Sequence, residues 1–135
     1  MKKKITIAID AMGGDNSPDK TISGVGLFVK KNISKDDFII HLFGNEEILK
    51  KKLEEKNISS NNIRITNTAA VVSDDETPLT AIKNSKNTSM WNCIQSQIYG
   101  DADISLSAGN TAVLLVVSKM ILKMMIYYSN SRRMT

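Results

Sequence analysis

Four short apolar segments alternate with longer polar or amphipathic segments along the chain. Each apolar segment has the length and residue types of a strand and ends at glycine, asparagine, aspartate or serine: KITIAID, DFIIHLFG, NIRITN and ADISLS. In the first, Ile5, Ile7 and Ile9 alternate with small residues, and we expect a buried strand. Strands that alternate with helices indicate a parallel sheet covered on both faces. The sequence therefore predicts an α/β fold.

The first two helices follow from local signals. Ser17 before Pro18 predicts an N-cap and a first helical position, and the helix should run through Lys31. The segment NEEILKKKLEEKN predicts a charged helix whose sparse apolar side is Ile48 and Leu53.

The second half of the chain repeats these signals. A short helix is predicted from Pro78, and another is capped at Thr88 or Ser89 and ends at Gly100. The latter places Met90, Ile94 and Ile98 on one face. AGN is a predicted turn, and a final helix is expected from position 111 onward.

Composition limits the class of protein. The 135 residues suit one domain, expected over residues 1–128, with an unstructured tail over 129–135. A single cysteine excludes an internal disulfide and suits a reducing cytoplasm. The net charge of +4 comes largely from the two ends of the chain, so we expect no nucleic-acid partner.

Residues 113–128 form the one candidate membrane segment. They number 16 and include Lys119 and Lys123, whereas a membrane span needs about 20 apolar residues. The two lysines share one helical face. Burial of the apolar side against the sheet or a partner is the first interpretation, and binding at a membrane surface is the second.

Two strand-to-helix junctions, IDAMGGDNSP and LSAGNT, carry the strongest functional signal. Ligands of open α/β sheets bind where such junctions meet, at the carboxyl ends of the strands. Glycines admit an anion close to the backbone, and helix N-termini attract it. Alternatively, Gly13, Gly14 and Gly109 only form tight turns. Two such junctions together favour a shared site for a phosphate-like ligand, although neither is a Walker loop or a dinucleotide fingerprint.

A third segment, DDETPLTAIKNSKNTSMW, adds cations and hydroxyl groups. Lys83 and Lys86 are expected to face the same way, one helical turn apart, and Ser85, Thr88 and Ser89 follow or interleave. Such groups suit phosphate or a phosphorylated carrier. The alternative interpretation is a solvated lysine face.

The remaining polar residues are expected to be structural. The acidic run Asp74, Asp75 and Glu76 precedes a helix, so we interpret it as compensating the helix dipole and not as a metal site. His41 is expected to pack within a strand. Cys93 lies in an amphipathic helix and is expected to be buried and inert.

Taken together, these segments resemble the bacterial phosphate acyltransferases of phospholipid synthesis. The resemblance runs from about Ile5 to Met120 and rests on IDAMGGDNSP and SLSAGNT, which are specific when they occur together. The middle segment adds support through five residues: Pro78, Ala81, Lys86, Ser89 and Met90.

This resemblance implies a Rossmann-like three-layer α/β/α fold, similar to the isocitrate and isopropylmalate dehydrogenases, in a homodimer. It implies a reaction in which inorganic phosphate attacks the thioester of acyl-[acyl carrier protein] and forms an acyl phosphate, without a cofactor. It also implies a cytoplasmic protein, peripherally associated with the membrane, where a glycerol-3-phosphate acyltransferase takes up the product.

The resemblance also implies which residues bind phosphate or substrate. Backbone N–H groups at Gly14 and Gly109, with Asn110 and Thr111, would hold phosphate or the thioester oxyanion. No general base and no metal ligand is assigned. The full set of expected binding residues is Asp10, Gly13, Gly14, Asp15, Lys83, Lys86, Ser89, Ser107, Gly109, Asn110 and Thr111.

Three departures from the family pattern stand out. Ala112 replaces a glycine after SAGNT, Lys83 replaces an arginine, and family chains are more than twice as long. We therefore interpret the sequence as the amino-terminal part of a phosphate acyltransferase, from a disrupted gene or completed by a second half. Two alternatives are a binding module for phosphate or carrier protein without turnover, and an inactive remnant.

Overall fold

The computed structural model describes residues 2–73, 75, 77–84 and 86–121. Strands and helices alternate as the sequence predicted. The described elements are β1 (Ile5–Asp10), α1 (Asp19–Lys31), β2 (Phe38–Gly44), α2 (Glu46–Glu55), β3 (Ile63–Asn67), α3 (Pro78–Asn84), α4 (Ser89–Ile98) and β4 (Ile104–Ser107). A further helix covers residues 111–121.

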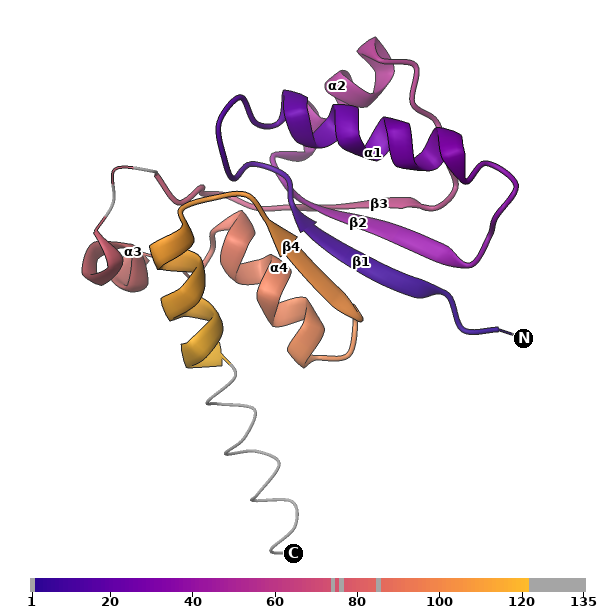
Figure 1. The fold of residues 1–135 in the computed structure, drawn as a ribbon. Helices are drawn as coiled ribbons and strands as arrows, with labels where there is room; N and C mark the ends of the chain where they lie inside the picture. Colours follow the sequence, from indigo (N-terminus) through magenta and orange to yellow (C-terminus); the bar gives the residue numbers. More distant parts are fainter. Residues whose placement is uncertain (1, 74, 76, 85, 122–135) are drawn as a thin grey trace, which may run out of the picture.

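The four strands form one parallel sheet in the order β3-β2-β1-β4 (Figure 1). β1 lies between β2 and β4, and its register aligns Ile9 with Leu42 on one side and with Leu106 on the other. The carboxyl ends of β1 and β4 therefore lie side by side, which brings the two glycine junctions to the same edge of the sheet.

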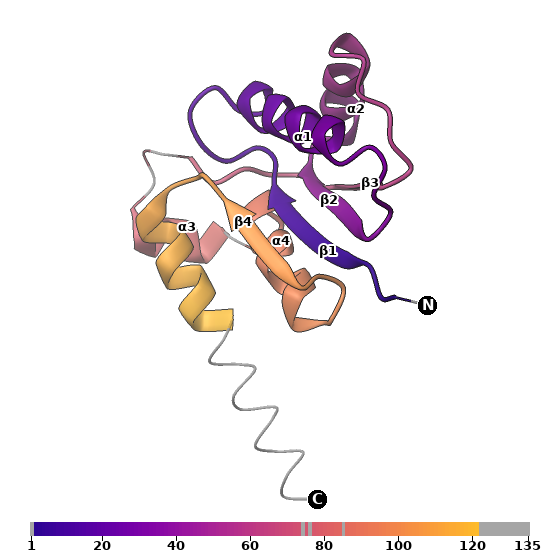
Figure 2. The ribbon, with the colours of Figure 1, turned by 45° about the vertical axis from the view of Figure 1, so that its right-hand side comes forward.

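Helices cover both faces, which confirms the α/β three-layer prediction (Figures 1 and 2). α1 and α2 lie on one face and pack on β2 and β3. α4 lies on the other face, against β1, β2 and β4, and the helix over 111–121 packs on α4.

The core differs from the sequence prediction in one strand and one helix. In β1 the buried residues are Thr6, Ala8 and Asp10, whereas Ile5 is 52% exposed and Ile7 and Ile9 are half-buried. The reason is that α4 packs closely on the small residues, while α1 covers the isoleucine face only in part. In α2 the buried residues are Leu49 and Leu53, and Ile48 is exposed.

The start of α1 also differs from the prediction. Pro18 is the N-cap residue, and no side chain caps the helix. The Ser17 hydroxyl donates instead to the Gly13 carbonyl oxygen at 2.5 Å. By contrast, the start of α4 is confirmed, because the Thr88 side chain accepts a hydrogen bond from the Trp91 N–H. α4 buries Met90 and Ile94 as predicted.

Within the described residues, no helix has the length and apolar character needed to cross a membrane. Val113, Val117 and Ile121 of the last helix are buried against Met90, Trp91 and Ile94 of α4. Up to residue 121 the apolar side is therefore buried, as the first interpretation predicted, but against α4 and not against the sheet or a partner. The remainder of the segment over 113–128 and the predicted tail over 129–135 lie outside the described residues.

Candidate functional site

The carboxylate of Asp10 lies at the centre of the edge where the two glycine junctions meet. Asp10 ends β1, and only 2% of its surface is exposed. Its Oδ1 accepts hydrogen bonds from the Met12 N–H at 3.3 Å and the Gly13 N–H at 3.1 Å. A buried carboxylate needs such donors, because burial removes its hydration. The turn after β1 is thus shaped around this carboxylate.

Two serine hydroxyls complete the shell of donors around Asp10. Ser89, the first residue of α4, donates to Oδ1 at 2.6 Å. Ser107, the last residue of β4, donates to Oδ2 at 2.8 Å and accepts a hydrogen bond from the Gly109 N–H at 3.1 Å. The three segments that the sequence singled out therefore converge on one side chain.

The two glycine turns are in direct contact. A Cβ atom at Gly13 would overlap the Asp10 carboxylate and lie 3.1 Å from the Cα of Gly109. Gly14 has a φ of +94°, and a Cβ there would lie 2.6 Å from the Ala108 carbonyl oxygen. Only glycine fits at these positions without a shift of the backbone. The sequence predicted this proximity but had no signal for the part played by Ala108.

Asn110 caps the last helix. Its Oδ1 accepts hydrogen bonds from the N–H groups of Ala112 at 3.1 Å and Val113 at 3.2 Å. Ala112 is exposed, so its methyl group does not crowd the start of the helix. Thr111 is also exposed, at the N-terminal end of this helix. The site edge therefore carries a capped helix N-terminus, which favours negative charge nearby.

Two backbone donors of the first turn remain available. Among the described residues, the N–H groups of Gly14 and Asp15 have no hydrogen-bond acceptor, and the Asp15 side chain is exposed. These groups follow Gly13, whose own N–H is held by Asp10. The arrangement can therefore hold an anion with backbone N–H groups, whereas the Asp10 carboxylate is fully engaged in positioning the turns.

Lys83 and Lys86 are not on one helix, contrary to the prediction. α3 ends at Asn84, and Lys86 lies in a turn before α4 begins at Ser89. Both lysines are exposed. The structure brings Ser89 to Asp10, but no described contact joins either lysine to the glycine turns.

Cys93 and His41 have the structural character that the sequence predicted. Burial, with the nearby negative charge of Asp10, raises the pKa of the Cys93 thiol to about 12, so the thiol stays protonated and inert. His41 contacts Thr66 Oγ1 through Nε2 at 2.7 Å and stacks on Phe43. Desolvation, and then the positive charge of Arg64, lower the pKa of His41.

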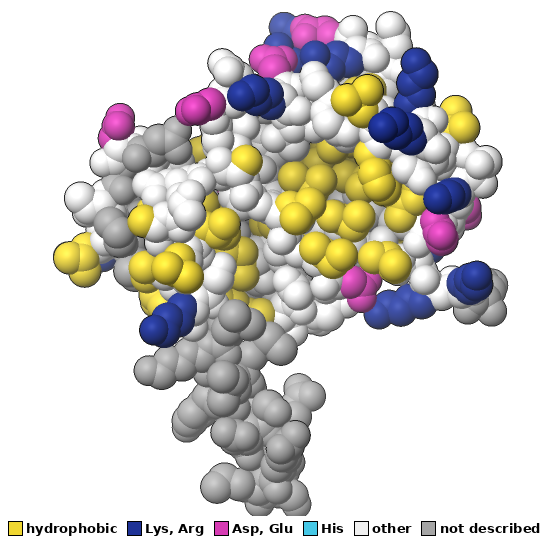
Figure 3. All heavy atoms as spheres, in the orientation of Figure 1, with side chains coloured by type: hydrophobic (Ala, Val, Ile, Leu, Met, Phe, Trp, Pro, Cys, Tyr) yellow, Lys and Arg dark blue, Asp and Glu magenta, His cyan; other side chains and the backbone are white. Residues whose placement is uncertain are grey.

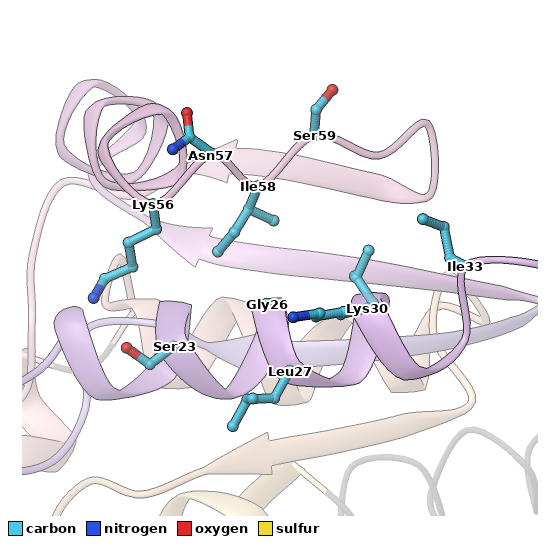
Figure 4. Close-up of a pocket in the computed structure, with 10 residues that line it drawn as sticks. Ser23, Gly26, Leu27, Lys30, Ile33, Lys56, Asn57, Ile58 and Ser59 are labelled. Atoms are coloured by element: carbon cyan, nitrogen blue, oxygen red, sulfur yellow. The ribbon is translucent and has the colours of Figure 1, made fainter.

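No group of acidic, histidine or cysteine side chains suited to a metal ion occurs in the described part of the chain. Asp74 and Glu76 lie outside it. A groove of about 630 Å³ runs along α1 (Figure 4). Its lining comes from α1, the residue Ile33 and the loop after α2, so it lies away from the carboxyl edge and does not belong to the candidate site.

Comparison with known proteins places this site in a family context. Residues 5–127 match a family described as "Fatty acid synthesis protein". The chain belongs to this family. Among curated relatives, a phosphate acyltransferase of Pelagibacter ubique is 44% identical over 124 residues. Phosphate acyltransferases of Streptococcus uberis and Ruegeria pomeroyi are 42% and 34% identical over 115 and 120 residues.

The chain spans about a third of the length of these fatty acid synthesis family relatives. The match to the Pelagibacter protein covers 92% of this chain but 36% of that protein. The corresponding shares are 85% and 31% for the Streptococcus protein, and 89% and 32% for the Ruegeria protein. The candidate site therefore corresponds to a region that makes up about one third of each relative.

Proposed function

We propose that this chain is part of a phosphate acyltransferase that forms acyl phosphate from acyl-[acyl carrier protein] and inorganic phosphate. Family membership and the relatives' name support this reaction. The structural observation that carries it is the contact between the two glycine turns. Held together through Asp10, they leave the N–H groups of Gly14 and Asp15 at the carboxyl edge of the sheet.

In this proposal backbone N–H groups bind the negatively charged phosphate. Phosphate oxygens attack a thioester carbonyl, whose oxygen becomes negative as the carbon turns tetrahedral. The N–H groups of Gly14 and Asp15 hold phosphate, and the start of the helix at Asn110 and Thr111 stabilises negative charge beside it. The attack of one phosphate oxygen forms the acyl–oxygen bond, and the tetrahedral intermediate then collapses as the carbon–sulfur bond breaks and the thiolate of the carrier protein's prosthetic group leaves.

The side chains have two further roles in the proposal. Asp10, Gly13, Ser89, Ser107 and Gly109 keep the two turns in contact, as positioning residues rather than direct ligands. Lys83 and Lys86, both exposed, meet the acidic surface of the carrier protein.

The proposal extends to the setting of the whole protein by family resemblance. We place it in the cytoplasm as a homodimer, peripherally associated with the membrane, where a glycerol-3-phosphate acyltransferase receives the acyl phosphate. Within that protein, residues 1–128 would form one α/β unit followed by a tail.

The test separates binding from turnover. Inorganic phosphate is titrated into the isotope-labelled chain, and amide shifts at Gly14 and Asp15 are followed by NMR. Acyl-phosphate formation is then assayed with acyl carrier protein, for the chain alone and with the remaining part of the Pelagibacter relative. Shifts together with turnover support the proposal. Shifts without turnover in either sample indicate a binding module, and no shifts contradict the assigned site.

A matched pair of variants controls for general effects of substitution. Gly14→Ala places a methyl group against Ala108 at a positive φ, and we expect the phosphate-dependent shifts to be lost. Gly24→Ala is the control, because a Cβ there meets no atom within 4 Å. Equal phosphate binding by both variants would contradict the role of the first turn.

A further inference from the structure

The groove between α1 and the loop after α2 has an apolar floor (Figure 4). Its volume of about 630 Å³ falls within the range of about 300–1,000 Å³ that is typical of small-molecule sites. Val29 and Ile58, which pack on the core beneath, form the floor from opposite sides. Gly26 admits Ile58 to the surface of α1, because a Cβ at Gly26 would lie 2.7 Å from Ile58 Cδ1. Ile33, 85% exposed, extends the apolar lining beyond the end of α1.

Two lysines place positive charge over this floor. Lys56 extends from the loop toward α1, and the Lys30 side chain lies over α1 on the other side (Figure 4). Both are exposed, and among the described residues neither forms a salt bridge and no lining residue is acidic. Asp19 and Glu55, which lie on the same two helices, both contact Lys52 instead. The positive charge over the groove is therefore available to a ligand.

This combination selects one chemical class of ligand. A small inorganic anion would meet the ammonium groups but leave the apolar floor in water, and a wholly apolar molecule would cover the lysines without a partner for their charge. A cationic amphiphile would be repelled by both lysines. A molecule with an alkyl chain and one anionic end satisfies the floor and the charges together. Figure 3 shows hydrophobic and basic side chains next to one another around α1.

We propose that the groove binds a soluble anionic amphiphile, such as a medium-chain carboxylate, at a site separate from the carboxyl edge of the sheet. The carboxylate lies between the ammonium groups of Lys30 and Lys56, and the alkyl chain lies on Val29, Ile58 and Ile33. Charge complementarity determines the anionic head, and the apolar lining determines the chain. The proposal rests on the groove alone and is independent of the proposed reaction, whose phosphate site is built from the glycine turns.

The probe is sodium decanoate, titrated calorimetrically into the intact chain below the concentration at which it forms micelles. Hexanoate has the same head on a shorter chain, and decyltrimethylammonium has a chain of similar length with a positive head. Because each buried methylene contributes up to about fourfold to affinity, decanoate should bind at least about tenfold more tightly than hexanoate. Decyltrimethylammonium should not bind. Equal affinity for the two carboxylates, or for the two decyl probes, would overturn the proposal.

Two double variants test the lysines. Lys30→Gln with Lys56→Gln removes both charges from the groove, whereas Lys20→Gln with Lys31→Gln removes two exposed charges of α1 that do not line it. Exposed ion pairs contribute up to about fivefold each, so the groove variant should bind decanoate at least about fourfold more weakly. The control should stay within about twofold of the wild-type chain at about 0.15 M salt, which screens its charges. Equal affinity of both double variants would overturn the proposal.

Gly26 and Gly24 provide a matched pair for the floor. Gly26→Leu drives a side chain against Ile58 and fills the groove, so decanoate binding should be lost. Gly24→Leu should bind as the wild-type chain does, because a Cβ there meets no atom within 4 Å. Circular dichroism checks that both variants fold, and the lysine variants decide the question if Gly26→Leu does not. Undiminished binding by folded Gly26→Leu would overturn the proposal.

The position of the ligand is read from amide shifts of the isotope-labelled chain. Decanoate should shift the amides of Gly26, Lys30 and Ile58 and leave those of Gly14 and Asp15 unchanged. Shifts confined to Gly14 and Asp15 would place decanoate at the carboxyl edge. A parallel sample contains phosphatidylglycerol vesicles, and binding of vesicles without binding of decanoate would assign the groove to a lipid surface. Either result would overturn the proposal.

Discussion

β1 divides the sheet into two halves that share one pattern of side chains but differ in what covers them. On the β2 side, Leu42 is fully buried beneath α1 and α2. On the β4 side, Leu106 occupies the same row and is half exposed. Both residues align with Ile9. The difference shows that the same apolar side-chain pattern on a strand can be buried or exposed, so the pattern alone does not indicate which layer covers it.

The largest effect is expected from truncating the same residue type in the two halves. Leu42→Ala should lower the free energy of unfolding by about 2–5 kcal/mol, because it leaves a cavity in the packed core. Leu106→Ala should change it by less than about 1 kcal/mol, since water already reaches that side chain. Urea denaturation of the two variants measures both values. Comparable losses would mean that the two halves are equally packed.

The second prediction concerns the polar junction that ties the end of β4 to β1. Asp10→Ala should cost about 2–4 kcal/mol, because the buried hydroxyl of Ser89 and the partly buried hydroxyl of Ser107 lose their acceptor. Asp15→Ala, in the same turn but exposed, should stay within about 0.5 kcal/mol. Both are measured by urea denaturation.

This comparison also decides what holds β4 in place. If Asp10→Ala were no more destabilising than Asp15→Ala, the junction would contribute little, and pairing with β1 together with contacts with α4 would hold β4. A large loss confined to Asp10→Ala would show that the β4 half depends on hydrogen bonds where the β2 half depends on buried apolar surface.

The third prediction compares two glycines within the covered half. Gly24→Ala should stabilise the chain by about 0.5–1 kcal/mol, because α1 gains helix propensity and nothing obstructs the methyl group. At Gly26 a Cβ would lie 2.7 Å from Ile58 Cδ1, so Ile58 must move and the gain should be reduced or reversed. Thermal unfolding of the two variants provides the measurement. A larger gain at Gly26 would show that Ile58 packs loosely there.

The strands and helices, and their order, were predictable from the sequence because their signals are local. Caps such as Thr88 and breaks such as Gly100 lie within a few residues of the elements that they end. The exposed face of β1 was not predictable, because alternation of Ile5, Ile7 and Ile9 looks the same whether or not a layer covers it. Whether this face is covered depends on segments that lie outside the local sequence pattern.

For the candidate site, sequence alone predicted which segments meet but not how. Asp10 was expected beside an anion. Its carboxylate instead accepts hydrogen bonds from the hydroxyls of Ser89 and Ser107, which are separated from it by 79 and 97 positions in the sequence. No local pattern specifies partners at such separations. The prediction that Lys83 and Lys86 lie one helical turn apart was wrong for a related reason. α3 ends at Asn84, and a turn then leads into α4.

The smallest effect is expected at His41, on the opposite face of the covered strand β2. Desolvation lowers the pKa of this imidazole, and Arg64 lowers it further, so the folded chain favours the neutral form. Its contribution to stability is therefore complete above the unfolded pKa of about 6.5 and is lost as the pH falls toward the lower folded pKa. Because the ring is half exposed, solvent screening keeps this contribution small.

The measurement is the urea midpoint at pH 7.5 and at pH 5.5, for the wild-type chain and for His41→Gln. The wild-type midpoint should fall on acidification, and the fall should be smaller in the variant, whose amide does not titrate. An equal fall would assign the acid sensitivity to other groups. A larger fall in the variant would mean that the folded chain favours the charged imidazole. Solvent would then reach His41 more readily than its stacking on Phe43 indicates.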